Sequence, residues 1–171
     1  MWSKCRSKES AVWRGRLVRV SSIRPIRAYD PPAHMCALGR LFAQIDAQLS
    51  SAWQVFPQIG VVTDGATVRM PDLVIASADI DRDAPSVEAA RVALAIEIIS
   101  PGSKSFDTDV KPYEYADARI PYFWLVDPVP PVTVTAYALV DADYEESQRG
   151  EGIFVVAEPC PLRIDLAALA R

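Results

Sequence analysis

Two carboxylates stand in unusually apolar segments of the chain. Glu97 is the one charge in the apolar run of residues 92–99, and Asp72 follows Pro71 directly before the apolar residues 73–76. A carboxylate that stays charged in such a setting must be paired, bound to a cation, or placed where its strand ends. Two carboxylates at the ends of neighbouring strands can share one divalent cation, and oxygen ligands suit Mg²⁺ or Mn²⁺.

A simpler structural interpretation is open for each carboxylate. Asp72 could cap a turn, and Glu97 could form a salt bridge with Arg69 or Arg91. For either residue alone this interpretation is the better one. The two carboxylates together, with the helix that follows them, favour a functional site.

That helix carries the third candidate residue. Asp107 and Lys111 are four positions apart and therefore share a helix face, and Lys111 is the only lysine from residue 105 to the C-terminus. An ordinary surface ion pair would explain the spacing. In the functional interpretation the ammonium points toward Asp72 and Glu97, where it helps to position or deprotonate water or neutralises a phosphate.

Other metal or nucleophile chemistry finds little support. His34 is the only histidine, which excludes a site built from several histidines, and no G-x-S-x-G motif supports a Ser-His-Asp triad around it. As a lone histidine just before a helix, His34 is expected to cap that helix or lie in the core. The three cysteines, Cys5, Cys36 and Cys160, lack CxxC spacing and are expected to be reduced thiols.

The elements that must position these residues follow from apolar periodicity. A helix is predicted over residues 35–49, with Met35, Leu38, Leu41, Phe42, Ile45 and Leu49 on its buried face. Strands are predicted over residues 54–62, 67–76, 92–99 and 122–126, with a hairpin turn at 63–66, a loop at 78–88 and a helix over 107–119. The C-terminal part is predicted as a hairpin of residues 132–140 and 152–157, joined by an acidic loop, and a closing helix over 164–169. The predicted core includes Phe42, Ile45, Val74, Leu94, Ile96, Phe123 and Val126.

Composition bounds the class of protein. The chain has 171 residues, of which 50% are hydrophobic and 23% charged, and this suits one globular domain over residues 31–171. Residues 1–30 form a basic N-terminal segment, which is expected to be solvated and partly disordered. No apolar run is long enough for a membrane helix, and no apolar segment follows the basic N-terminus as in a secretory signal, so the cytoplasm is the expected compartment.

Four motifs in order resemble the Uma2 family. They are Pro-Asp-Leu-Val at 71–74, Glu-Ile-Ile-Ser-Pro at 97–101, Asp107-x3-Lys111-x3-Tyr115, and the stretch 120–128 that ends in Trp-Leu-Val-Asp-Pro. The resemblance covers residues 31–170 and is closest over 71–128. It implies an α/β restriction endonuclease-like fold of the PD-(D/E)XK kind, with a central mixed β-sheet, an αβββαβ core and a β-rich C-terminal extension.

The resemblance also implies a site and an activity. Asp72 and Glu97 would bind Mg²⁺ or Mn²⁺, with the carbonyl of Ile98 as a third ligand, while Ser100 and Asp107 would orient the site. The standard nuclease motif places its lysine two residues after the glutamate, where this chain has Ile99, so Lys111 would be the catalytic lysine. The implied function is a metal-dependent endonuclease acting on nucleic acid, DNA before RNA, with a homodimer as one option for its assembly.

A second class of function remains open. A non-catalytic binding or regulatory module could keep the nuclease-like scaffold, and the acidic body of the chain, which repels a polyanion, favours that alternative. Residues 1–27 hold eight basic residues and one acidic residue, a charge of +7, so the rest of the chain must carry −4 − 7 = −11. The N-terminus also departs from the family, because Arg14 and Arg16 stand where an acidic hairpin is usual.

Overall fold

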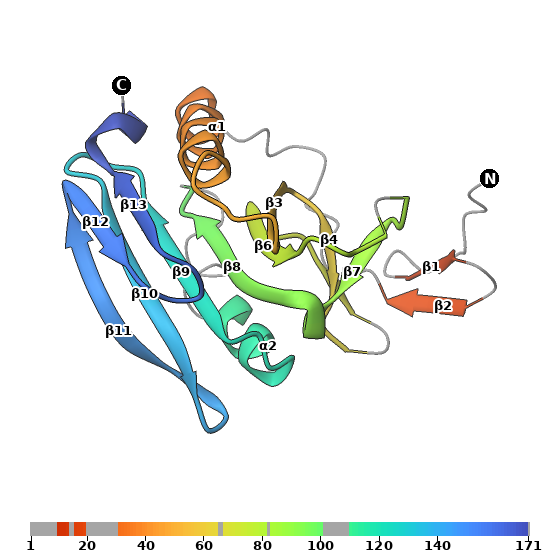
Figure 1. Ribbon diagram of the computed structural model, residues 1–171. Helices are drawn as coiled ribbons and strands as arrows, with labels where there is room; N and C mark the ends of the chain where they lie inside the picture. Colours follow the sequence, from red (N-terminus) through yellow and green to blue (C-terminus); the bar gives the residue numbers. More distant parts are fainter. Residues whose placement is uncertain are drawn as a thin grey trace.

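A six-stranded mixed sheet forms the centre of the computed structural model (Figure 1). The structure describes residues 31–64, 67–81, 83–100 and 110–170, and the backbone of residues 10–13 and 16–19. The strand order is β11-β10-β9-β8-β6-β3, in which β8 and β9 run parallel and all other neighbours are antiparallel. These strands are β3 (Trp53–Pro57), β6 (Leu73–Ser77), β8 (Val92–Ile98), β9 (Tyr122–Asp127), β10 (Thr133–Val140) and β11 (Asp143–Glu151).

Two helices cover opposite faces of this sheet. Helix α1 (Pro32–Asp46) begins with a proline, which fits the first turn because its missing N–H needs no partner there. Its Leu41 packs in one core cluster with Leu73 and Ile96. Helix α2 (Lys111–Asp117) lies on the other face, where its Tyr115 joins a second cluster that includes Ala95.

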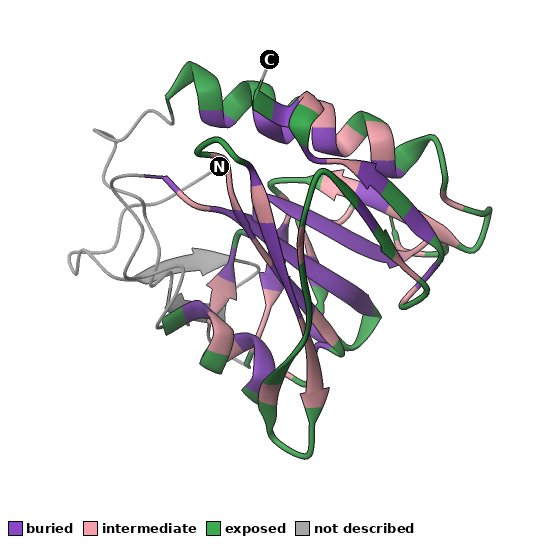
Figure 2. Cartoon of the chain, turned by 90° about the vertical axis from the view of Figure 1, so that its left-hand side faces the viewer, coloured by how far each residue is buried: buried purple, intermediate pink, exposed green. Residues whose placement is uncertain are grey.

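Strand β8 separates the two clusters. All of its seven residues are buried, as the unbroken apolar run predicts for a central strand (Figure 2). Side chains alternate along a strand, so Leu94, Ile96 and Ile98 face α1 while Ala95 faces α2. Glu97 has the parity of Ala95 and therefore points toward α2.

Smaller pairings surround the main sheet. Strands β4 (Gly60–Val62), β5 (Val68–Arg69) and β7 (Ser86–Glu88) form a three-stranded sheet, and β12 (Ile153–Val156) pairs with β13 (Leu162–Asp165). Strands β1 (Ser10–Trp13) and β2 (Arg16–Arg19) form an antiparallel pair within the basic N-terminal segment. Two short 3₁₀ helices, η1 (Ala89–Arg91) and η3 (Ala167–Ala170), complete the described elements.

Two predicted strands are each broken into two. The segment 54–62 breaks into β3 and β4 at Gln58, whose positive φ of 49° cannot continue a strand. The segment 67–76 breaks into β5 and β6 around Pro71, which has no N–H for a ladder. Strands β4 and β5 pair antiparallel, as the predicted hairpin requires, and residues 65–66 of its turn lie outside the described residues.

The predicted C-terminal hairpin is wrong. The acidic stretch expected to be a loop is strand β11, which pairs with β10 along its length. A strand at the edge of a sheet is held by main-chain hydrogen bonds to one neighbour, so solvated acidic side chains do not prevent β11 from forming. Residues 153–156 instead pair with β13, and the closing helix expected from residue 164 is reduced to η3. The predicted loop 78–88 likewise contains β7, which pairs parallel to β4.

Most of the predicted core is confirmed, but the buried face of α1 differs from the prediction. Ile45, Val74, Leu94, Ile96, Phe123 and Val126 are buried, while Phe42 is only partly buried. Met35 is 46% exposed and its neighbour His34 only 2%. The stripe that faces the sheet therefore runs from His34 through Ala37 and Leu41. Leu49 lies beyond the end of the helix.

No helix in the part of the chain that the structure describes is long and apolar enough to span a bilayer.

Candidate active site

Asp72 is fixed at the end of β8 by hydrogen bonds. It immediately precedes β6 and is 1% exposed, and its Oδ2 accepts a hydrogen bond of 2.8 Å from the N–H of Ile98. Its own main-chain carbonyl accepts the N–H of Gln58 at 3.0 Å, so the break between β3 and β4 also helps to hold this residue. Asp72 thus bonds to the neighbouring strand β8 through its side chain.

The surroundings of Asp72 favour its charged form. Burial raises the pKa of this carboxyl, but the hydrogen bond and charge of His34, the Ile98 N–H and the charge of Lys111 together lower it below its ordinary value. Asp72 is therefore a carboxylate at neutral pH. The influence of Lys111 also shows that its ammonium belongs to the electrostatic surroundings of Asp72.

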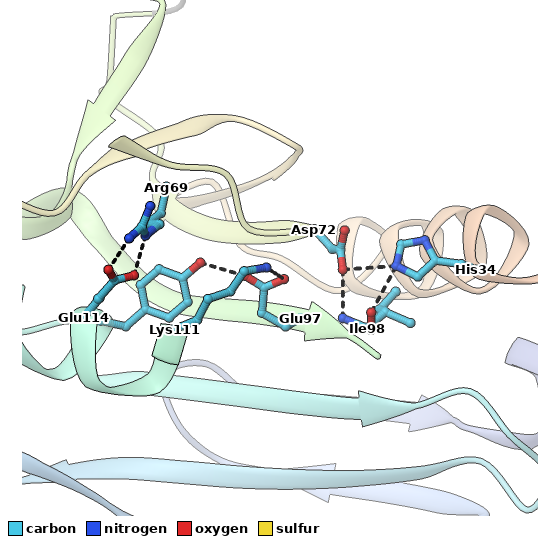
Figure 3. A network of polar contacts seen from close by, with 8 residues as sticks. His34, Arg69, Asp72, Glu97, Ile98, Lys111 and Glu114 are labelled. Carbon is cyan, nitrogen blue, oxygen red and sulfur yellow. Dashed lines mark hydrogen bonds and ion pairs between the residues drawn. The ribbon is translucent and has the colours of Figure 1, made fainter. Parts of the chain in front are cut away.

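Glu97 is fully buried and held from α2 by two side chains. The hydroxyl of Tyr115 donates to Oε1 at 2.6 Å, and the ammonium Nζ of Lys111 lies 2.7 Å from Oε2 (Figure 3). Lys111 and Tyr115 are four positions apart and therefore lie on one face of the helix. Burial, then the charge and hydrogen bond of Glu97, raise the pKa of Tyr115 well above 10.0, so its hydroxyl stays protonated and donates.

Both arginines considered as partners for Glu97 form ion pairs elsewhere. Arg69 binds both carboxylate oxygens of Glu114 on α2, through its Nε and one terminal nitrogen. Arg91 binds Asp79 at the surface. Lys111 is an ion-pair partner of Glu97 in this structure. Arg69 joins the same helix to β5 through Glu114, one position before Tyr115.

His34 lies beside Asp72, which the sequence interpretation missed. Its Nε2 is 3.0 Å from the carbonyl oxygen of Ile98 and 3.2 Å from Asp72 Oδ2 (Figure 3). It is buried, as a core histidine would be, but its ring nitrogen faces two polar atoms of the candidate site. The signal that could have found it is periodicity, since position 34 continues the buried stripe of Ala37, Leu41 and Ile45.

The remaining predicted site residues are placed only in part. Ser100 is buried, two residues after Ile98, and Asp107 lies outside the described residues. Ile99 donates its N–H to the carbonyl of Val126 at 2.8 Å. Its alkyl side chain stands at the sequence position that holds the lysine in the standard nuclease motif. The ammonium beside Glu97 is instead that of Lys111 on α2. Among the aromatic side chains of α2 and β9, Tyr115 and Trp124 are buried and Tyr113 is 67% exposed.

The donor atoms fit a hard divalent cation. Two carboxylates and the Ile98 carbonyl are oxygen ligands of the type that Mg²⁺ and Mn²⁺ prefer. Asp72 Oδ2 and the Ile98 oxygen both contact one nitrogen of His34, so these two atoms lie within reach of a common point. Within the described residues no three His, Cys, Asp or Glu side chains form a complete site. A cation here would therefore also use main-chain oxygen and water, as Mg²⁺ usually does.

Comparisons with known proteins identify the family and the fold of this chain. The family model of Uma2, described as "Putative restriction endonuclease", matches residues 24–167. A solved structure titled as "a putative nuclease belonging to DUF820 from Anabaena variabilis ATCC 29413" is similar with a TM-score of 0.65 and 17% sequence identity, over 94% of this chain and 88% of that one. No curated protein matches the sequence. The solved structure confirms the predicted restriction endonuclease-like fold.

Proposed function

Because this chain belongs to the Uma2 family, we propose that it is a metal-dependent endonuclease that hydrolyses phosphodiester bonds of DNA. In this proposal Asp72 and Glu97 bind Mg²⁺ or Mn²⁺, together with the Ile98 carbonyl, and Lys111 is the catalytic lysine. One observation carries it above all others. The Lys111 ammonium lies 2.7 Å from Glu97, although the strand position that usually supplies the lysine holds an isoleucine.

A bound divalent cation would supply Lewis-acid chemistry and lower the pKa of a bound water. The protein residues have separate tasks around it. Asp72, whose pKa is lowered, presents a charged oxygen donor at neutral pH. Tyr115 occupies one oxygen of Glu97 and so fixes the direction of the other, which faces Lys111.

Lys111 stabilises negative charge on the phosphate as it develops. Its side chain is 7% exposed, and in such surroundings a fixed charge acts more strongly than in bulk water. The helix delivers the ammonium in a set direction because Tyr115 and the Arg69–Glu114 pair hold α2 against the sheet. Ser100 and Asp107 are proposed to orient these groups, and Asp107 stands four positions before the lysine in the sequence.

Metal binding and cleavage are tested on the same set of variants. Mn²⁺ should raise the melting temperature of the wild type, and Asp72→Ala and Glu97→Ala should remove this shift and Mg²⁺-dependent nicking of supercoiled plasmid DNA. Asp79→Ala serves as the control because its carboxylate is 70% exposed and bound to Arg91. A wild type that binds Mn²⁺ through Asp72 and Glu97 but cleaves no nucleic acid would favour the non-catalytic module. A shift that survives both substitutions would reject the metal site.

A further inference from the structure

Within the part of the chain that the structure describes, His34 is a buried polar residue to which the proposed chemistry gives no role. Its imidazole is 2% exposed and lies between two oxygens, with Nε2 3.0 Å from Ile98 O and 3.2 Å from Asp72 Oδ2. Both of these oxygens belong to residues proposed to bind the cation. A carbonyl oxygen can only accept a hydrogen bond, so Nε2 carries a hydrogen in the arrangement that the structure shows.

The position of this imidazole is set by the whole of α1. Ala37, Leu41 and Ile45 bury the helix against the sheet, and the Gln44 side chain donates to the carbonyl of Asp165 at 3.1 Å and accepts its N–H at 2.7 Å. The helix is thus held at its far end by β13, independently of the site. His34 is therefore presented to Asp72 by a rigid element, which is the condition for a preorganised ligand.

The distances from His34 Nε2 to Asp72 Oδ2 and to the Ile98 oxygen are those expected between neighbouring ligands of one cation. With metal–ligand bonds of about 2.1 Å at right angles, adjacent ligand atoms of an octahedral shell lie about 3 Å apart. The two distances from Nε2 have this size. The atoms that share a hydrogen bond in this structure can therefore share a cation with little movement, once the hydrogen of the neutral ring resides on Nδ1.

We propose that His34 is a direct ligand of the divalent cation, through Nε2, beside Asp72 and the Ile98 carbonyl. The inference rests on the proposed function, because it concerns the same metal site. It adds a nitrogen to a ligand set that otherwise consists of oxygens. Imidazole suits transition metals better than Mg²⁺, so the site should prefer Mn²⁺ to Mg²⁺.

The single histidine of the chain makes a direct test available. Untagged protein labelled with ¹⁵N-histidine is loaded with Mn²⁺ and examined by electron–nuclear double resonance. The expected spectrum shows a coupling to ¹⁵N of a directly bound imidazole, which can come only from His34. In His34→Gln the coupling disappears, Mn²⁺ affinity falls by more than about tenfold, and Mg²⁺ affinity falls less. Asp79→Ala should keep the coupling.

The outcomes separate this inference from the proposed function. Mn²⁺ that binds, depends on Asp72 and Glu97, and shows no histidine coupling would overturn the ligand role of His34 while the metal site stands. Wild-type protein that binds no Mn²⁺ would overturn both. If His34→Gln does not fold, the labelled wild type still decides, because the chain has no other histidine to produce the signal.

Discussion

Glu97 and Lys111 meet between the central strand β8 and helix α2, with the ammonium Nζ 2.7 Å from the carboxylate Oε2. The two residues are almost fully buried, and they lie in segments that are separated by residues 101–109, outside the described part of the chain. Their contact joins the predicted metal ligand to the predicted catalytic lysine.

Lys111→Ala should reduce Mg²⁺-dependent DNA cleavage by roughly 10²–10³-fold, because the ammonium stabilises charge that develops in the transition state. Mn²⁺ affinity should be retained. The change also removes the cation beside a buried carboxylate, so a stability loss of about 3–5 kcal/mol is expected, and rates are compared well below the melting temperature. Lys111→Arg should rescue poorly because a guanidinium has a different shape. Cleavage by Lys111→Ala at the wild-type rate would make Lys111 a structural residue only.

Tyr115→Phe should lower kcat by roughly tenfold with little change in KM, since the ring stays and only the hydrogen bond to Glu97 Oε1 is lost. Tyr144→Phe is the matched control, because its hydroxyl donates to the Ile120 carbonyl at 2.8 Å, outside the proposed site. Both variants should lose about 1–3 kcal/mol of unfolding free energy in urea titrations. Equal kcat in the two variants would show that Tyr115 does not position Glu97.

The Arg69–Glu114 ion pair should contribute to stability more than the Arg91–Asp79 pair. The side chains of the first pair are 5% and 27% exposed, and those of the second 43% and 70%. Glu114→Ala should cost about 3–5 kcal/mol, because it removes the carboxylate that binds a buried arginine through two nitrogens. Asp79→Ala should cost less than about 1 kcal/mol. Double-mutant cycles measured by chemical unfolding test this order, and equal coupling energies would contradict it.

Ile96→Ala should lower the unfolding free energy by roughly 2–5 kcal/mol. Ile96 is fully buried in the cluster between β8 and α1, and the register pairs it with Leu73 of β6. Ile153→Ala is the control, because Ile153 is 46% exposed and should lose about 0.5 kcal/mol or less. A loss at position 96 no larger than that at 153 would mean that Ile96 does not face the core.

Two of the six tyrosines should resist titration in the folded protein. Burial raises the pKa of Tyr115 and Tyr144 above 10.0, the ordinary value. A phenol whose folded pKa is raised contributes stability that is fully present below pH 10 and is lost as pH rises toward the folded value. Absorbance at 295 nm should therefore show delayed ionisation that coincides with alkaline loss of circular dichroism. Complete titration near pH 10 in a folded protein would contradict this expectation.

The central strand could be predicted from the sequence for a clear physical reason. An unbroken apolar run with one charge is typical of a strand that is buried on both faces, and this rule placed β8. The contact between Lys111 and Glu97 was expected only from the functional interpretation and the family resemblance, because the residues alone also allowed Arg69 or Arg91 as the partner of Glu97. The roles of Asp72, Glu97 and Lys111 in metal binding and catalysis stay predictions.

Other features depend on tertiary contacts that local patterns do not encode. Strand β11 is acidic and mostly exposed, and its main-chain pairing with β10 cannot be recognised from its amino-acid composition. His34 and Met35 both lie close to the apolar stripe of α1, and hydropathy alone favours the methionine. The buried acceptors Asp72 Oδ2 and Ile98 O explain why the histidine faces inward instead.

The anchoring of α1 by β13 also orders events during synthesis of the chain. Gln44 binds Asp165, which is 121 positions further along, and Arg40 donates to the carbonyl of Leu169. A ribosome that adds 5–20 residues per second needs roughly 6–24 s to cover that interval. Until then α1 lacks these anchors, and His34 is not yet held beside Asp72. The helix that carries His34 therefore gains this support only after β13 has been synthesised.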